Sequence, residues 1–280
     1  MVNDRSKNIV SLRKIDFATL LGLVVGIGGI LFGLILEGGR FSDVAQYTAA
    51  LIVGAGTAGA VMVNTPKALL LSSLRRLKHV LFDDTPVRAA LLDQLLHFAR
   101  QARRAGIVSL EDEADSITDN PFLKKALMLA VDGTDLQDLR RIMELEIEAA
   151  ARRGEAEAKV FETAGGYAPT IGIIGAVLGL IQVMKHLEDM ERVGHGIATA
   201  FVATVYGVAL ANLVLLPAGA KLKARLEQTL EDKELMLEGV IGIAEGMNPK
   251  LLENKLGAFL EQDAKDEEAG KERKPASLAA

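Results

Sequence analysis

Residues 167–184 read YAPTIGIIGAVLGLIQVM, and no Asp, Glu, Lys or Arg interrupts this apolar run. Three other runs, Phe17–Leu36, Ala45–Val63 and Ile197–Leu216, are equally free of these four residue types. A helix needs about 17–25 apolar residues to cross the hydrocarbon core of a bilayer, and each run meets that length. The sequence therefore predicts four membrane-spanning helices, with no side chain of their own that could carry charge through the membrane.

The composition supports a membrane protein and excludes several other classes. Half of the chain is apolar although only 4% is aromatic, which favours membrane helices over a tightly packed soluble core. The absence of cysteine rules out disulfides and thiolate chemistry, and the net charge of −5 gives no reason to expect nucleic-acid binding. No nucleophile motif, nucleotide loop or metal cluster is visible, so we expect neither an enzyme nor a cofactor or metal.

The distribution of Lys and Arg predicts the orientation in the membrane. Basic residues gather before the first run, directly after the fourth, and between residues 67 and 164, where there are 15. The two remaining connections, Glu37–Val44 and Lys185–Gly196, hold one and two. We therefore expect both termini and the large loop to be cytoplasmic, in a multi-pass protein of the bacterial inner membrane.

The organisation along the chain is that of an all-α polytopic membrane protein with a large helical cytoplasmic domain between the second and third spans. We expect four segments: 1–66 with the first two spans, 67–164 as the cytoplasmic domain, 165–217 with the last two spans, and 218–280 as a helical tail whose end is disordered. Helix starts are expected at Asn120-Pro121 and at a capping box of Ser109 with Asp112.

Small residues recur at helical spacing in all four runs. The stripes are Gly22, Gly26, Gly29 and Gly33; Ala50, Gly54 and Ala58; Gly172, Gly175, Ala176 and Gly179; and Ala203, Gly207 and Ala211. Such stripes let helix backbones approach closely in lipid. For the first two runs we favour packing within one subunit, whereas for the last two we favour faces that surround another helix over packing of the same kind.

Together with ATAFVATVYGVALANLVLLPAGAKL, which follows from residue 198, the run at 167–184 resembles the last two helices of the MotA/TolQ/ExbB family of ion-driven motor proteins. Two spans, a cytoplasmic domain and two further spans resemble its flagellar stator branch, whereas TolQ and ExbB have three spans. The segments ARQARRAGIVSLEDEAD and EGVIGIAEGMNPKLLENKL extend the likeness to about Leu260.

The resemblance implies a stator subunit of which about five copies, a homopentamer, surround two MotB helices in the membrane lipid and turn against the rotor protein FliG. Protons would pass by way of a MotB aspartate, which agrees with spans that lack charge. The family pattern places Pro169, Phe201 and Thr204 around that aspartate, with Thr199 nearby and Pro217 at the lower end. A hydroxyl such as that of Thr204 can instead bond to its own helix.

Two further groups of residues carry over from the family. Ala176 stands where sodium-driven relatives typically have Thr, which favours protons over sodium as the coupling ion. The rotor-facing charges carry over to Arg103 and Glu111, with Arg104 as a substitute, although each charge also complements a helix dipole.

The residues alone leave three alternative functions open. The alternative most similar to a stator subunit is an ExbB- or TolQ-like energiser of a periplasm-spanning partner. A self-sufficient channel or transporter is disfavoured by the absence of intramembrane charge. A purely structural membrane scaffold is the third.

Overall fold

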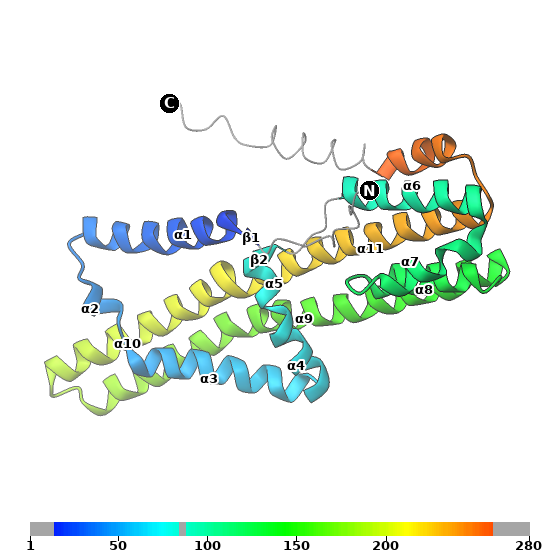
Figure 1. The fold of residues 1–280 in the computed structure, drawn as a ribbon. Coiled ribbons are helices and arrows are strands. Elements are labelled where there is room, and N and C mark those ends of the chain that lie inside the picture. The colour runs from blue at the N-terminus through cyan, green and yellow to red at the C-terminus, as the bar shows by residue number, and fades with distance from the viewer. Residues whose placement is uncertain (1–13, 84–87, 260–280) are drawn as a thin grey trace. The chain divides into compact units, whose positions relative to one another are not determined.

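The computed structural model describes residues 14–83 and 88–259, in which the chain is helical apart from one short strand pair (Figure 1). The strands β1 (Lys14–Ile15) and β2 (Phe82–Asp83) run antiparallel, with Lys14 opposite Asp83. The helical elements are α1 (Phe17–Leu36), α2 (Phe41–Val44), α3 (Tyr47–Asn64), α4 (Lys67–Arg76), α5 (Lys78–Leu81), α6 (Arg88–Ala105), η1 (Ile107–Leu110), α7 (Glu111–Ser116), α8 (Pro121–Val131), α9 (Leu136–Lys185), α10 (Met190–Ala209), η2 (Leu210–Leu215) and α11 (Leu216–Ala244).

The described residues form two compact units. Unit 1 comprises residues 88–151 and 227–259, and unit 2 comprises residues 14–83 and 152–226. The long helices α9 and α11 contribute to both units, because each continues without a break from an apolar run into a charged amphipathic stretch. An all-α fold with long apolar helices was expected from the sequence, and this is confirmed apart from the two-residue strand pair.

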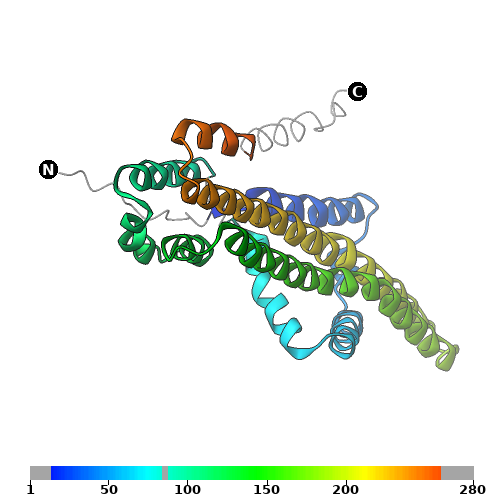
Figure 2. The same cartoon turned by 90° about the vertical axis from the view of Figure 1, so that its right-hand side faces the viewer.

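Among the described residues, four helical stretches are long and apolar enough to cross a membrane, and each overlaps one of the four runs. The helix α1 has the bounds of the first run, and α3 begins two residues later than the second. The third run is the C-terminal part of α9, and the fourth extends over α10 and η2. In both views α9 lies beside α10 and the start of α11 (Figures 1 and 2).

Glycine and alanine set the distance between α9 and α10. A Cβ added to Gly207 would lie 2.5 Å from the carbonyl oxygen of Ala168, and one added to Gly179 would lie 2.9 Å from the Ala200 Cβ. A Cβ added to Gly172 would likewise lie 2.9 Å from the carbonyl oxygen of Ala203. The stripes of the third and fourth runs therefore pack against each other within the chain, as close backbone approach in lipid requires. The expectation that they surround another helix is wrong for Gly172, Gly179 and Gly207.

The stripes of the first two runs behave differently from the expectation. Only Gly26 packs within the chain, against Leu213 of η2, whereas an added Cβ at Gly22, Gly29 or Gly33 meets no atom of the described chain within 4 Å. In α3 the residues Ala50, Gly54 and Ala58 are exposed, because that helix packs through Ala49, Val53, Thr57 and Val61 instead. Packing within one subunit is therefore wrong for most of these positions.

The fourth run contains a π-helical segment that the sequence did not reveal. In η2 the backbone N–H of Leu216 donates to the carbonyl of Ala211, five residues back. The side chain of Asn212 donates to the carbonyl oxygen of Val208 at 2.9 Å, which satisfies a helix carbonyl beside this change of pitch. Such segments are rare inside α-helices and concentrate at functional sites. Pro217, which cannot donate a backbone hydrogen bond, follows two residues later.

Unit 1 has an apolar core made by α6, η1, α7, α8, α9, α11 and the helical stretch 249–259. Fully buried leucines such as Leu95, Leu123, Leu139 and Leu235 come from four of these helices. Arg88 is buried beside this core and donates to Asp232 at 2.6 Å, so that both charges are paired.

Some helix starts follow the predicted signals and others do not. Asn120 caps α8 by accepting from the N–H of Leu123 at 3.1 Å, as expected from Asn-Pro. The capping box expected from Ser109 with Asp112 is wrong, because α7 begins at Glu111 with no side-chain cap. The hydroxyl of Ser109 donates backward to the carbonyl oxygen of Gly106 at 2.6 Å instead.

Candidate functional site

The surface of α10 beside its contact with α9 carries two of the expected path residues, Phe201 and Thr204. Ala200, Ala203 and Gly207 are buried against α9, whereas Phe201 is 71% exposed and Thr204 is partly exposed. Since residues three and four apart share a helix face, Phe201 and Thr204 belong to one surface, which is open in the single chain. The hydroxyl of Thr204 donates to the carbonyl oxygen of Ala200 at 3.3 Å, so it is bonded to its own helix here.

Pro169 and Ala176 lie on the neighbouring helix, beside the same stretch of α10. An added Cβ at Gly207 would lie 3.2 Å from the Pro169 Cα, and one at Gly172 would lie 3.4 Å from the Thr204 Cα. The close contact between the two helices therefore brings Pro169 within about one turn of Thr204. Ala176 follows Gly172 by one turn and is partly exposed.

The two remaining residues expected at this site lie farther along the helices. Thr199 sits one turn before Ala203 on α10 and donates its hydroxyl to the carbonyl oxygen of His195 at 2.9 Å. Pro217 is exposed just after η2. The structure thus brings Pro169 and Thr204 together at the contact between α9 and α10, with Ala176 one turn after Gly172. Thr199 adjoins Ala200, which belongs to the same contact, and Pro217 follows η2.

The three expected rotor-facing charges lie at one tip of unit 1. Arg103 and Arg104 are exposed in the last turn of α6, and Glu111 is exposed as the first residue of α7. Gly106 turns the chain between them with a φ of +83°, a value that suits glycine. Within the part of the chain that the structure describes, none of the three charges has an ion-pair partner, so all remain available to another protein.

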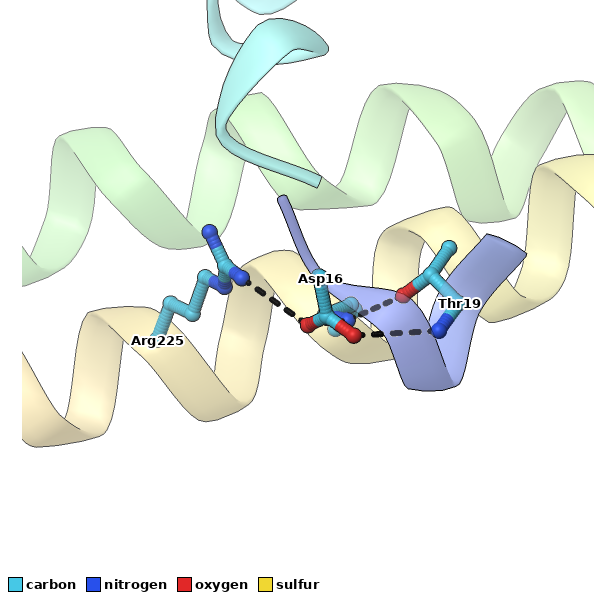
Figure 3. Close-up of polar contacts among 4 residues, drawn as sticks. Asp16, Thr19 and Arg225 are labelled. Carbon is cyan, nitrogen blue, oxygen red and sulfur yellow. Dashed lines mark hydrogen bonds and ion pairs between the residues drawn. The ribbon is translucent and has the colours of Figure 1, made fainter. Parts of the chain in front are cut away.

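A charged cluster at the start of α1 was missed by the sequence reasoning (Figure 3). Asp16 caps α1 by accepting from the N–H of Thr19 at 3.0 Å, and its carboxylate also binds Lys221 and Arg225 of α11. Above all the hydrogen bond from Lys221, opposed by partial burial, holds the pKa of Asp16 at about 2, below its ordinary 3.8. An Asp directly before an apolar run was the available signal.

Glu157 of α9 is a second charged group that the sequence reasoning missed. It is buried, and its carboxylate lies 2.9 Å from the Nε of Arg76 and 3.3 Å from that of Arg153. Its neighbours Gly154 and Ala158 are also buried. The sequence around Glu157 gave no sign that this carboxylate is buried and paired. Among the described residues, no three acidic or histidine side chains gather closely enough to hold a metal ion.

Comparison with known proteins identifies the family of the chain. Residues 114–235 match the model of the MotA/TolQ/ExbB proton channel family. The chain is 37% identical to Motility protein A of Bacillus subtilis (strain 168), over 88% of this chain and 91% of that protein.

Two solved structures are similar to the fold. The structure of C. jejuni MotAB superimposes with a TM-score of 0.83 at 36% identity, covering 88% of this chain and 96% of that one. The flagellar MotAB stator complex from Bacillus subtilis gives a TM-score of 0.80 at 34% identity, covering 86% and 95%. On this identity and coverage, the chain belongs to the MotA/TolQ/ExbB proton channel family.

Proposed function

We propose that this chain is the membrane subunit of a flagellar motor stator and, with MotB, conducts protons and converts their flow into rotation. Family membership and the likeness to MotAB stator complexes support this function. The four apolar helical stretches cross the bacterial inner membrane, with both termini and the large loop in the cytoplasm, in accord with the distribution of Lys and Arg. We expect no enzymatic activity.

The absence of charge within the four spans is the observation that carries the proton mechanism. No Asp, Glu, Lys or Arg occurs in them, so the titrating carboxylate comes from MotB. Protonating that carboxylate removes the cost of a charge near lipid and changes which surrounding surface suits it. At about 2.3 kcal/mol per charge for each 100 mV, the membrane potential supplies energy for such a step.

The open surface of α10 is the place where that carboxylate would pass. Phe201 is exposed and Thr204 is partly exposed beside the contact with α9, and no residue of α1 is buried within the described chain. These uncovered faces suit a homo-oligomer, which we propose is a pentamer around two MotB helices. Ala176 offers no hydroxyl ligand for sodium, so protons are the proposed coupling ion, and swimming should persist in sodium-free medium.

The tip of unit 1 is the proposed contact with FliG. Arg103, Arg104 and Glu111 are exposed there without ion-pair partners among the described residues. Exposed charges of this kind steer and orient docking more than they add affinity. Rotation of the ring would reach the rotor through this contact.

The decisive experiment removes the Thr204 hydroxyl from the complete complex. Thr204→Val, expressed with MotB in cells that lack their own stator, should assemble normally and lower swimming speed under viscous load. Thr163→Val is the matched control, because the Thr163 hydroxyl also donates to the carbonyl four residues back, that of Lys159 at 2.8 Å, but lies outside the apolar run. Equal speeds of the two variants would remove Thr204 from the path, and proton flux through the chain without MotB would contradict the proposed mechanism.

A further inference from the structure

The short helix α4 presents a surface that neither the ion path nor the rotor contact uses. It begins three residues after α3 ends, with Thr65 and Pro66 between them. Figures 1 and 2 show α4 turning away from the axis of α3. If α3 crosses the membrane as proposed, α4 begins where the chain leaves the bilayer on the cytoplasmic side.

One face of α4 is held against the rest of unit 2. Ser73 is fully buried, and its hydroxyl donates to the carbonyl oxygen of Leu69 at 2.8 Å. Leu69 and Leu70 pack against a cluster that contains Val61 of α3 and Val160 of α9. This contact fixes the rotation of α4 about its own axis and therefore determines which residues point away.

The opposite face combines two leucines with basic residues. Lys67, Leu71, Leu74 and Lys78 follow one another at four, three and four positions, and Leu77 keeps a helical conformation between α4 and α5, so the four share a face. Leu71 is 45% exposed and Leu74 is 54% exposed. Arg75 lies beside them and is exposed as well.

The charges on this face have no counterpart in the described part of the chain. Lys67, Arg75 and Lys78 form no ion pair there, unlike Arg76, which pairs with the buried Glu157. The sequence contains no Asp or Glu from residue 66 to residue 82. The surface is therefore apolar in the middle and basic around it, and α4 contributes no acidic group to it.

We propose that this surface of α4 binds the anionic phospholipids of the cytoplasmic leaflet. Leu71 and Leu74 enter the boundary between headgroups and acyl chains, and the Lys and Arg side chains extend to the lipid phosphates. A second copy of the chain would have to bring acidic groups to three unpaired cations, whereas an anionic membrane surface supplies them beside the end of α3. The proposal rests on the proposed membrane topology but not on the motor function.

The absence of Trp from the chain allows a direct test. The full-length Leu74→Trp variant is reconstituted into phosphatidylcholine vesicles that contain brominated phosphatidylcholine or, at the same mole fraction, brominated phosphatidylglycerol. We expect both lipids to quench the fluorescence, the anionic one at least about twofold more strongly, because each basic residue near an anionic surface contributes about 1 kcal/mol of attraction, roughly a fivefold enrichment. The stronger quenching by the anionic lipid should diminish at high salt, which screens the attraction between charges.

Removing the basic residues tests the headgroup preference. In the Leu74→Trp background, Lys67→Gln, Arg75→Gln and Lys78→Gln together should equalise quenching by the two lipids. The matched control removes three exposed arginines that also lack ion pairs among the described residues, Arg100, Arg103 and Arg104, and should leave the twofold excess unchanged.

The outcomes separate this inference from the membrane topology. Phe32→Trp, on exposed α1, reports whether the spans lie in lipid. If Phe32→Trp is quenched but Leu74→Trp is not, protein covers α4 and the inference is overturned while the topology stands. Equal quenching of Leu74→Trp by both lipids also overturns it, because the surface would then show no selection for anionic headgroups. If Phe32→Trp is not quenched, the topology fails and the inference fails with it.

Discussion

The replacement Asp16→Asn should measurably destabilise the protein, because it removes the charge at the centre of the cluster in Figure 3. Asn keeps the size of the side chain and a carbonyl oxygen that can still accept from the N–H of Thr19. What it loses is the charged contact with Lys221 and Arg225, which ties the start of α1 to α11. The variant therefore isolates the electrostatic contribution of this contact.

The size of the effect follows from the pKa of Asp16. It lies at about 2, against an ordinary value of 3.8. At about 1.4 kcal/mol per pH unit, this difference corresponds to about 2.5 kcal/mol. The side chain is still 16% exposed and solvent screens part of the interaction, so we expect a loss of about 1–2 kcal/mol. For a chain of this size, the midpoint of thermal unfolding should fall by roughly 2–8 °C.

The direction of the pKa shift determines how the stability difference between wild type and Asp16→Asn depends on pH. Since the pKa is lower in the folded state than in the unfolded state, the stabilisation is fully present above about pH 4. It is lost as the pH falls from about 4 towards about 2, where Asp16 becomes protonated in the folded protein as well. The difference between wild type and Asp16→Asn should therefore be constant near neutral pH and close in this acidic window.

Thermal unfolding of the full chain in detergent, followed by circular dichroism from pH 2 to pH 7, provides the measurement. Asp43→Asn is the matched control, because the Asp43 carboxylate accepts from the backbone N–H of Arg40 at 2.8 Å on an exposed surface. A change within about 0.5 kcal/mol is expected there. Equal midpoints for the two variants at neutral pH, or a difference that persists unchanged at pH 2, would refute the reasoning.

Three further variants test other parts of the structure. Gly207→Ala places a Cβ 2.5 Å from the backbone of α9 and should reduce co-purification with MotB, whereas Gly28→Ala, where an added Cβ meets nothing within 4 Å, should not; equal yields would contradict this packing. Arg88→Ala leaves the buried Asp232 without this partner and should lower the free energy of unfolding in urea by about 3–5 kcal/mol, so a loss below about 1 kcal/mol would argue against a tight buried pair. Arg103→Glu should impair swarming at normal protein levels, with partial recovery when a FliG charge is reversed, and normal swarming would remove Arg103 from the rotor contact.

Much of this protein follows from local sequence. The bounds of α1 coincide with an apolar run, since crossing a bilayer requires an uninterrupted apolar helix of a set length. Asn120-Pro121 starts α8 and Gly106 ends α6, because capping and a positive φ depend only on neighbouring residues. The family resemblance likewise rests on local segments, and the roles proposed for Thr204 and Arg103 rest on their place in those segments.

Only the tertiary structure showed which neighbours the faces of the four apolar runs contact. The sequence could not tell whether the stripe at Gly207 meets the same chain, because every small-residue stripe looks alike until a partner helix is placed against it. It also gave no sign that Asp16 meets Lys221, some 200 residues away, or that η2 changes pitch. Such features depend on contacts between distant segments, and the physical reason is that a side chain's charge or size acquires its energetic effect only from what packs beside it.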